Sequence, residues 1–316
     1  MRYRDLRVAL AVPCFNEEGA IRQVIRDFRN AMPELEIYVF DNRSQDQTAA
    51  VARAEGATVI SVDTPGKGSV VRRMFADVDP DILVMVDGDA TYLARAVTQM
   101  VDKLIDERLD MVVGSRSTPK DNMPEAYRRG HQFGNQLLTS SVKRIFGGAF
   151  SDMLSGYRVF TRRYIKSFPA TSQGFEIETE LTIHALELRM PSGEVPVEYG
   201  ARPVGTESKL STYRDGWRIL RTIVHLYIAE RPLSFYSLCA LLIAGTSIGI
   251  FVPVIFDYME TGLVERFPTA ILSASMMICA LLSLACGLIL DNVVRGRQEA
   301  KRMAYLAIPH PASGGN

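Results

Sequence analysis

Two long apolar segments in the last third of the chain constrain its fold more than any other feature. Residues Pro232 to Phe256 and Phe267 to Leu290 contain no Asp, Glu, Lys or Arg. Each segment exceeds the roughly 20 residues that an α-helix needs to cross a bilayer. A helix buried in a soluble protein would normally carry a polar stripe, and neither segment has one. The sequence therefore predicts two transmembrane helices; the alternative is a pair of buried helices in a soluble protein.

Charged residues around these segments predict their orientation. The link between them, Asp257 to Arg266, is mainly acidic, whereas both outer flanks are basic. Because cytoplasmic loops are rich in Lys and Arg, both flanks should be cytoplasmic and the link should lie outside. The N-terminus shows no signal-peptide pattern, so we expect a multi-pass protein of the inner (plasma) membrane with a cytoplasmic N-terminal domain. The flanking basic residues are Arg214, Arg218, Arg221, Arg231, Arg295, Arg297, Lys301 and Arg302.

The overall composition gives no indication of a nucleic-acid partner. Lys plus Arg and Asp plus Glu each number 36, so the formal net charge is zero. The 4 cysteines form no C-x-x-C pair, and most of them lie in the apolar segments. We interpret them as small apolar residues in a reducing compartment, and not as a disulfide framework or a zinc site.

Strand-like and helix-like segments alternate over residues 1–115. The first strand should end at Pro13, and Asn16 should cap the helix that follows. Strands that alternate with helices of about 10 to 15 residues indicate an α/β fold with a mainly parallel sheet and helices on both faces. The predicted strands are residues 6–12, 36–40, 58–62, 81–86 and 111–114. The apolar face of the capped helix consists of Ile21, Val24, Ile25 and Phe28.

These patterns divide the chain into four regions. They are a cytoplasmic α/β domain (1–211), an amphipathic interface helix (212–231), a transmembrane hairpin (232–290) and a cytoplasmic tail (291–316). The interface helix is predicted from Tyr213 to Ile228, with a basic stripe and an apolar face, so it should lie among the lipid headgroups. The alternative is a helix that packs on the surface of the α/β domain.

Polar or glycine-rich clusters follow successive predicted strands, where parallel sheets bind their ligands. Asp87-Gly88-Asp89 comes directly after an apolar strand, so both carboxylates can reach one divalent cation. Oxygen ligands of this kind suit Mg²⁺ or Mn²⁺, with substrate phosphates and water completing the shell. Asp41, at the end of an earlier strand, is placed to bind a base or ribose; the alternative is a turn or capping residue.

Glycine-rich motifs exclude two common nucleotide-binding classes. A Walker A loop requires G-x-x-x-x-G-K followed by Ser or Thr, whereas Gly68 follows Lys67 here. The chain contains no G-x-G-x-x-G motif, which argues against a dinucleotide-dependent oxidoreductase.

The order of several motifs resembles that of family 2 glycosyltransferases with the GT-A fold, and most closely the polyprenyl-phosphate (dolichyl-phosphate-type) subgroup. The motifs, spread over residues 6–230, are VPCFNEE, DNRSQDQT, GKG, VDGDATY, GSR, DMLSGYR and RPVGTESK. The C-terminal pair of apolar segments also resembles bacterial members of that subgroup. Two departures stand out. Thr91 replaces the Gln that would be a third metal contact, and the usual D-D-x-S string becomes Asp41-Asn42-Arg43-Ser44.

The resemblance implies roles for particular residues. Metal binding falls to Asp87 and Asp89, with Mg²⁺ or Mn²⁺ as the ion. Nucleotide binding falls to Pro13, Asn16, Glu17, Asp41, Lys67 and Asp87. Phosphate or acceptor binding falls to Arg129, Arg202 and Lys209. Catalytic roles at the sugar and acceptor end fall to Arg116, Arg129, Asp152, Arg158 and Glu178. For Arg129 and Arg158 the alternative is a structural ion pair.

The expected activity is the inverting transfer of one sugar from a nucleotide-sugar, for which we favour a UDP-sugar, to a polyprenyl (undecaprenyl or dolichyl) phosphate. A lipid phosphate is already a nucleophile, so Asp152 could be a base or a group that orients the acceptor. The alternatives are a GDP-mannose-using mannose synthase, a processive polysaccharide synthase and a non-catalytic membrane scaffold. The processive class carries a Q-x-x-R-W motif, which this chain lacks. Bacterial relatives are often homotetramers, and the resemblance extends that expectation to this chain.

Overall fold

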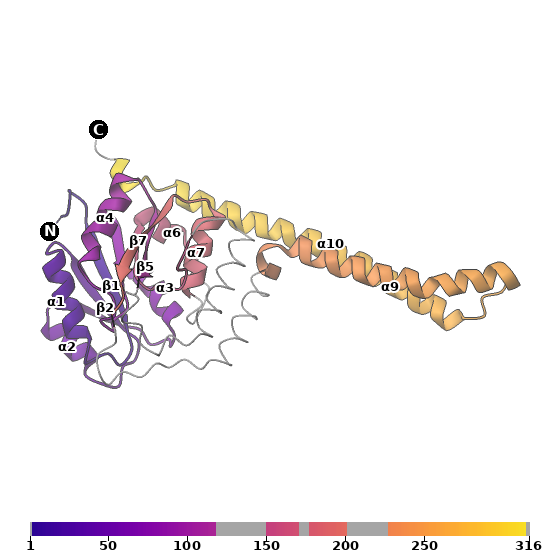
Figure 1. Cartoon of the computed structure of the whole chain (residues 1–316), viewed down its shortest axis with the longest axis horizontal. Helices are drawn as coiled ribbons and strands as arrows, with labels where there is room; N and C mark the ends of the chain where they lie inside the picture. The colour runs from indigo at the N-terminus through magenta and orange to yellow at the C-terminus, as the bar shows by residue number, and fades with distance from the viewer. Residues whose placement is uncertain (1, 118–149, 171–176, 201–226, 314–316) are drawn as a thin grey trace. The chain divides into compact units, whose positions relative to one another are not determined.

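The structure is a computed structural model, and it describes residues 2–117, 150–170, 177–200 and 227–313 (Figure 1). The chain divides into two compact units. The first comprises Met1–Ile219 together with Ala300–Asn316, and the second comprises Leu220–Glu299. The C-terminal end of the chain therefore belongs to the same unit as the N-terminal domain.

The first unit is built on a mixed sheet that has seven strands within the described residues, in the order β3-β2-β1-β4-β6-β5-β7. All neighbouring pairs are parallel except those of β6, which runs antiparallel to β4 and β5. The predicted α/β class with a mainly parallel sheet is confirmed. The strands are β1 (Val8–Cys14), β2 (Glu36–Asp41), β3 (Thr58–Ser61), β4 (Ile82–Met85), β5 (Met111–Ser117), β6 (Arg158–Thr161) and β7 (Ser192–Glu198).

Helices cover both faces of this sheet (Figure 1). One face packs against α1 (Ile21–Ala31), α2 (Thr48–Ala54) and α4 (Ala96–Asp106). The other packs against α3 (Lys67–Asp77), α6 (Arg162–Ser167) and α7 (Ile177–Glu187). Alternate residues of β1 enter the two cores, as the period of a strand requires: Val8, Leu10 and Val12 enter one, and Ala9 and Ala11 the other. The predicted apolar face of α1 is buried in the first core.

The first strand has the predicted length but lies two residues further along the chain, at Val8–Cys14. Pro13 does not end it, because β1 continues to Cys14 and Pro13 pairs with Phe40 of β2. Pairing of β1 with β4 stops at Ala11, so Pro13 lies where only one neighbouring strand remains. A proline is tolerated there because its missing N–H interrupts no second ladder.

The predicted helix cap at Asn16 is wrong. Helix α1 begins only at Ile21, and its N-cap position is Ala20. Asn16 instead adopts a left-handed backbone conformation with φ of 56°, which Asn tolerates better than most residues. Its Oδ1 accepts a hydrogen bond from the Gln45 backbone N–H at 2.8 Å, and its own N–H donates to Ser44 Oγ at 2.9 Å. Asn16 therefore ties the loop after β1 to the loop after β2.

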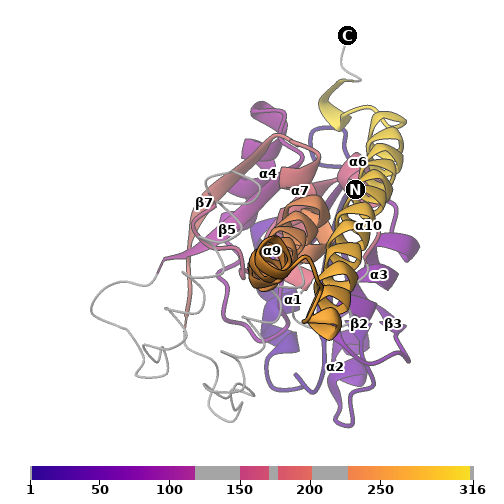
Figure 2. The ribbon, with the colours of Figure 1, turned by 90° about the vertical axis from the view of Figure 1, so that its right-hand side faces the viewer.

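Two helices are long and apolar enough to cross a membrane, α9 (Pro232–Thr261) and α10 (Phe267–Leu306). The second unit contains α9 and α10 as far as Glu299. Figure 2 shows them side by side, and Ser247 Oγ donates to the Ser273 carbonyl at 2.7 Å. Their buried residues recur every seventh position, the repeat of left-handed helix pairs. Apart from Pro232 at the start of α9, they are Ala240, Ser247 and Val254 in α9, and Ser273, Ala280, Gly287 and Val294 in α10. Most of the large apolar side chains outside this seam are exposed, as suits contact with lipid.

The end of α10, from Ala300, and the residues after it are part of the first unit. Lys301 forms an ion pair with the buried Glu187 at 2.7 Å. The Tyr305 hydroxyl donates to Asp110 at 2.8 Å, and the Arg163 guanidinium lies 4.6 Å from the centre of the Tyr305 ring. Because Asp110 is fully buried just before β5, the C-terminal segment completes the polar partners of a core carboxylate.

Candidate active site

The carboxyl ends of β1, β2 and β4 meet at one edge of the sheet because these strands are parallel neighbours. Asp41 is the last residue of β2, and its buried Oδ1 has no hydrogen-bond partner among the described residues. The next residue, Asn42, donates to the carbonyls of Val62 and Thr64 at 2.9 and 2.8 Å and accepts from the Gly66 N–H at 2.8 Å. Asn42 thus fixes the loop that leads into α3, while Asp41 keeps an open acceptor at the strand end.

The loop after β1 joins the same edge. Pro13 lies near the end of β1, paired with β2, and Asn16 contacts the loop after β2. The Glu17 N–H donates to Thr48 Oγ1 at 2.8 Å, at the first residue of α2. The structure therefore gathers the predicted nucleotide-binding residues Pro13, Asn16, Glu17 and Asp41 at adjacent strand ends.

A buried lysine joins the predicted metal site to α7. Lys67 Nζ lies 2.5 Å from Asp87 Oδ1 and 2.5 Å from Glu178 Oε1, and only 12% of its side chain is exposed. Burial alone would lower the pKa of Lys67, but the two carboxylates outweigh it and raise the pKa above its ordinary value. Lys67 is therefore a permanent cation held between two carboxylates from separate elements.

The second carboxylate of the D-x-D motif is held by Thr91. Asp89 is buried, and its Oδ1 accepts hydrogen bonds from Thr91 Oγ1 at 2.6 Å and from the Thr91 N–H at 3.2 Å. Thr91, which replaces the expected Gln, thus orients the neighbouring carboxylate. Among the described residues no group of three His, Cys, Asp or Glu side chains could hold a metal. Two carboxylates fit an Mg²⁺ or Mn²⁺ ion that takes its other ligands from water and substrate phosphates.

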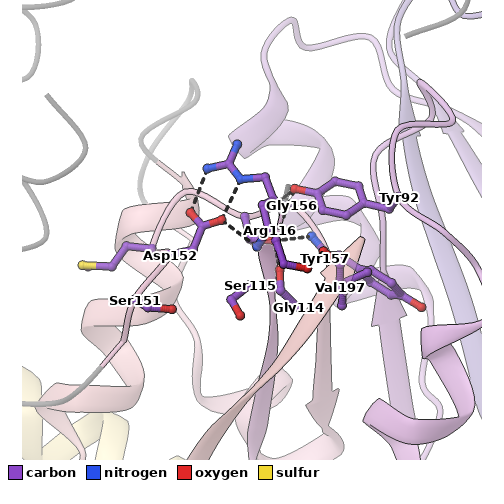
Figure 3. Close-up of polar contacts among 12 residues, drawn as sticks. Tyr92, Gly114, Ser115, Arg116, Ser151, Asp152, Gly156, Tyr157 and Val197 are labelled. Carbon is purple, nitrogen blue, oxygen red and sulfur yellow. Dashed lines mark hydrogen bonds and ion pairs between the residues drawn. The ribbon is translucent and has the colours of Figure 1, made fainter. Parts of the chain in front are cut away.

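Arg116 and Asp152 form a two-pronged ion pair at the end of β5 (Figure 3). Arg116 Nε and Nη2 donate to the two carboxylate oxygens at 2.6 and 2.7 Å, and the Arg116 backbone N–H donates to Oδ2 at 3.2 Å. Burial alone would raise the pKa of Asp152, but the hydrogen bonds and charge of Arg116 lower it below its ordinary value. Asp152 is therefore ionised at neutral pH and is a weak base.

Gly156 allows the loop after Asp152 to approach the metal motif. A methyl group at Gly156 would lie 2.2 Å from Asp87 Oδ2, closer than any real contact allows. The Gly156 N–H donates to the Tyr92 hydroxyl at 3.0 Å, as Figure 3 shows, and that hydroxyl also lies 3.3 Å from Ser155 Oγ. Tyr92 and Gly156 together set the position of the backbone against which Asp87 rests.

Glu194 of β7 holds the beginning of the same loop. Its Oε1 accepts from the backbone N–H groups of Ser151 and Asp152 at 2.7 and 3.3 Å. Its Oε2 accepts from Ser151 Oγ at 2.7 Å. Glu194 therefore orients the residue that pairs with Arg116, although it belongs to none of the motifs named from the sequence.

Arg158 lies beneath the site and is fully buried. Its guanidinium donates to the carbonyls of Met153, Ser155 and Glu178 at 2.5, 2.9 and 3.0 Å, and to Thr182 Oγ1 at 2.9 Å. These bonds fasten the loop of residues 153–158 to α7. With no exposed surface, Arg158 has no access to a substrate, and we assign it a positioning role in place of the predicted catalytic one.

Other predicted residues fall outside the described part of the chain. Arg129, Arg202 and Lys209 do so, as does most of the interface helix predicted from Tyr213 to Ile228. Sequence reasoning missed Tyr92, Gly156 and Glu194. The strings VDGDATY and DMLSGYR contain the first two, so a closer reading of those motifs could have found them. Glu194 gave no local signal.

Comparisons with known proteins identify the family. The profile of glycosyl transferase family 2 matches residues 9–168, about half of the chain. Glycosyltransferase AglJ of Haloferax volcanii is 30% identical over 301 residues, which cover 95% of this chain and 98% of that protein. A dolichyl-phosphate hexose transferase of the same organism is 28% identical, covering 72% of this chain and 96% of that one.

A solved structure supports the same fold. Glucosyl-3-phosphoglycerate synthase from Mycobacterium tuberculosis, crystallised with Mn²⁺ and UDP-glucose, superposes with a TM-score of 0.57 at 20% identity. The superposition covers 71% of this chain and 79% of that one. The carboxylate pair at the end of β4, the family match and the full-length similarity to AglJ agree: this chain belongs to glycosyl transferase family 2 and is a glycosyltransferase.

Proposed function

We propose that this enzyme transfers a single sugar, with inversion, from a nucleotide-sugar to a polyprenyl phosphate at the cytoplasmic face of the inner membrane. The observation that carries the proposal is one chain that combines the Asp87–Asp89 pair with two helices long enough to cross a membrane. The lipid acceptor is supported by the name of the dolichyl-phosphate hexose transferase. The match with this chain covers 96% of that protein. A membrane location follows because such an acceptor keeps its phosphate at the bilayer surface.

The donor would bind at the edge where β1, β2 and β4 end. The open Asp41 carboxylate suits a ribose or base, and Asp87 and Asp89 would hold Mg²⁺ or Mn²⁺. When bound, the ion would neutralise charge on the diphosphate leaving group. We favour a UDP-sugar because the solved relative contains UDP-glucose with Mn²⁺. GDP-mannose is the alternative donor.

The proposed sugar transfer does not require a strong general base. An oxygen of the lipid phosphate attacks the anomeric carbon, the bond from that carbon to the diphosphate oxygen breaks, and nucleoside diphosphate leaves. Since the phosphate enters as an anion, no proton has to be removed. The low pKa of Asp152 agrees with this, and we assign Asp152 to orienting Arg116. Arg116, with Arg129, Arg202 and Lys209, would compensate the charge of acceptor and leaving group.

A panel of nucleotide-sugars tests the proposal. The full chain in detergent is incubated with undecaprenyl or dolichyl phosphate, Mn²⁺ and each of UDP-glucose, UDP-N-acetylglucosamine and GDP-mannose, and products are identified by mass. We expect one lipid-linked sugar from one preferred donor and loss of product in Asp89→Asn. A ladder of sugars would instead indicate a processive synthase. No turnover with any donor would favour a non-catalytic scaffold, and the molecular mass in detergent would test the expected homotetramer.

A further inference from the structure

Lys67 forms an ion pair with Asp87, one of the two carboxylates predicted to bind the metal ion. Its ammonium lies between Asp87, a predicted metal ligand, and Glu178 of α7, at 2.5 Å from each. The trio is enclosed: 29% of the Asp87 side chain and 5% of the Glu178 side chain are exposed. A buried carboxylate needs a cation or several donors, and Lys67 supplies this need for both acids at once.

The trio is not electrically balanced. One ammonium faces two carboxylates, so a negative charge is left over if both acids are ionised. Glu178 Oε2 is buried and has no hydrogen-bond partner among the described residues. The buried Arg158 guanidinium adds positive charge beside Glu178, where it donates to the Glu178 carbonyl at 3.0 Å. Asp87, with 29% of its side chain exposed, is therefore the carboxylate of the trio that is open to a further cation.

Lys67 is also well placed to move. It is the first residue of α3, directly after Gly66, whose φ of 107° is a conformation that favours glycine. A lysine carries its charge on a flexible four-carbon stem with three donors, unlike the rigid fork of an arginine. An ion bound to Asp87 would repel the ammonium, whereas a diphosphate near the first turn of α3 would attract it.

We propose that Lys67 is an exchangeable counter-cation. In the free enzyme its ammonium neutralises Asp87. When a divalent ion binds Asp87 instead, the lysine side chain moves and its ammonium pairs with the donor diphosphate. Glu178 keeps the lysine close to the site. This inference rests on the proposed function, because it uses the metal and nucleotide of that reaction. The metal and the nucleotide should then bind cooperatively, because the metal displaces Lys67 and the nucleotide provides its new partner.

The rival account is a fixed structural ion pair. If Lys67 stayed with Asp87 and Glu178 throughout, its removal would leave buried carboxylates without a partner and weaken the fold. It would not change the degree to which a nucleotide strengthens metal binding. The thermodynamic coupling between Mn²⁺ and UDP therefore separates the two accounts.

Titration calorimetry of the full chain in detergent tests the exchange, with Mn²⁺ alone and Mn²⁺ in saturating UDP. In the wild type we expect UDP to tighten Mn²⁺ binding by about tenfold or more. In Lys67→Met, Mn²⁺ alone should bind about tenfold more tightly, and the effect of UDP should shrink accordingly. Lys67→Arg, which keeps the charge, should still bind Mn²⁺ weakly without UDP. Lys103→Met is the control and should behave as the wild type, because Lys103 belongs to α4 and pairs with Glu107 at the end of that helix.

A double variant shows whether a loss of stability in Lys67→Met affects the measurement. Lys67→Met with Glu178→Gln removes one cation and one anion together, so it leaves Asp87 open without adding net charge. It should show the same tight binding of Mn²⁺ alone, with a thermal midpoint close to that of the wild type. Unchanged or weaker Mn²⁺ binding in both variants, with coupling intact in the wild type, would refute the exchange and leave the proposed function standing. Absence of Mn²⁺ binding to the wild type with UDP or GDP would refute the metal assignment and the exchange together.

Discussion

The Asp152 carboxylate receives two hydrogen bonds from the Arg116 side chain, from Nε at 2.6 Å and from Nη2 at 2.7 Å. A planar guanidinium held in this way is fixed in direction as well as in position. Because the pair holds the pKa of Asp152 below its ordinary value, the carboxylate is suited to orienting Arg116 and not to accepting a proton. The role that we propose for Arg116 therefore depends on Asp152 and on the residues that hold this pair.

Asp152→Asn should lower kcat/KM by roughly 100-fold, because the amide keeps the shape but offers only one acceptor to the guanidinium. The loss should be uniform from pH 6 to 8. The folded pKa lies below the unfolded value, so the contribution of the pair to stability is complete above about pH 4 and disappears as the pH falls through the folded pKa. Initial rates across this range provide the measurement. Asp79→Asn is the matched control, since Asp79 forms the same two-pronged pair with Arg162 at the surface. A pH-dependent loss in Asp152→Asn would indicate a base after all.

Gly156→Ala should impair donor and metal binding, because the new methyl group would meet Asp87 Oδ2 at 2.2 Å. Asp87 would have to move, and a displacement of about 1 Å at such a site can reduce activity by roughly 100-fold. Calorimetry with Mn²⁺ and UDP, together with initial rates, measures the effect. Gly200→Ala serves as the control, since a methyl group there meets only the Thr91 carbonyl at an ordinary 3.7 Å. Equal binding by the two variants would show that Asp87 tolerates the shift.

Glu194→Gln should act through Asp152 and not on the substrate. The amide nitrogen of Gln cannot accept a hydrogen bond, so one side of the clamp on Ser151 and Asp152 is lost. We expect kcat to fall by about tenfold with little change in the KM for the donor. Glu198→Gln on the same strand is the control, because Glu198 pairs with Arg95 in an exposed position.

A double mutant separates positioning by Glu194 from general destabilisation. If Glu194 works only by orienting Asp152, then adding Glu194→Gln to Asp152→Asn should cost almost nothing further. Independent, multiplying losses in kcat would contradict this role. Thermal midpoints of all the variants show whether stability follows the same pattern.

The features that could be predicted from the sequence are those with local signals. The D-x-D motif could be recognised because Asp87 and Asp89 follow an apolar strand. The buried face of α1 could be predicted from the helical spacing of its apolar residues. Strand β6 was missed because its 4 residues begin with Arg158 and end with Thr161, which leaves only Val159 and Phe160 as an apolar run. Its antiparallel direction brings Arg158 and the preceding loop to the edge where the metal motif lies.

Contacts between distant segments could not be predicted. Nothing near Lys67 in the sequence points to Glu178, and the pairing exists only because α3 and α7 pack on the same face of the sheet. The left-handed Asn16 was mistaken for a helix cap because capping and tight turns favour the same residue type. Likewise, Lys301 and Tyr305 look like ordinary residues of a polar tail until Glu187 and Asp110 are seen beneath them.

His184 should make the fold sensitive to mild acid. It is buried in α7, with Nε2 2.9 Å from Ser167 Oγ. Burial, aided by the charge of Lys301, lowers its pKa from 6.5 to about 3. Below pH 6.5, His184 is therefore protonated in the unfolded chain but stays neutral in the folded chain, so the free energy of unfolding falls as the pH falls. The loss is about 1.4 kcal/mol per pH unit, or about 2 kcal/mol at pH 5. Thermal midpoints in detergent between pH 7 and 5 should drop more steeply for the wild type than for His184→Gln, which cannot titrate. Parallel slopes would mean that His184 takes up its proton in the folded enzyme.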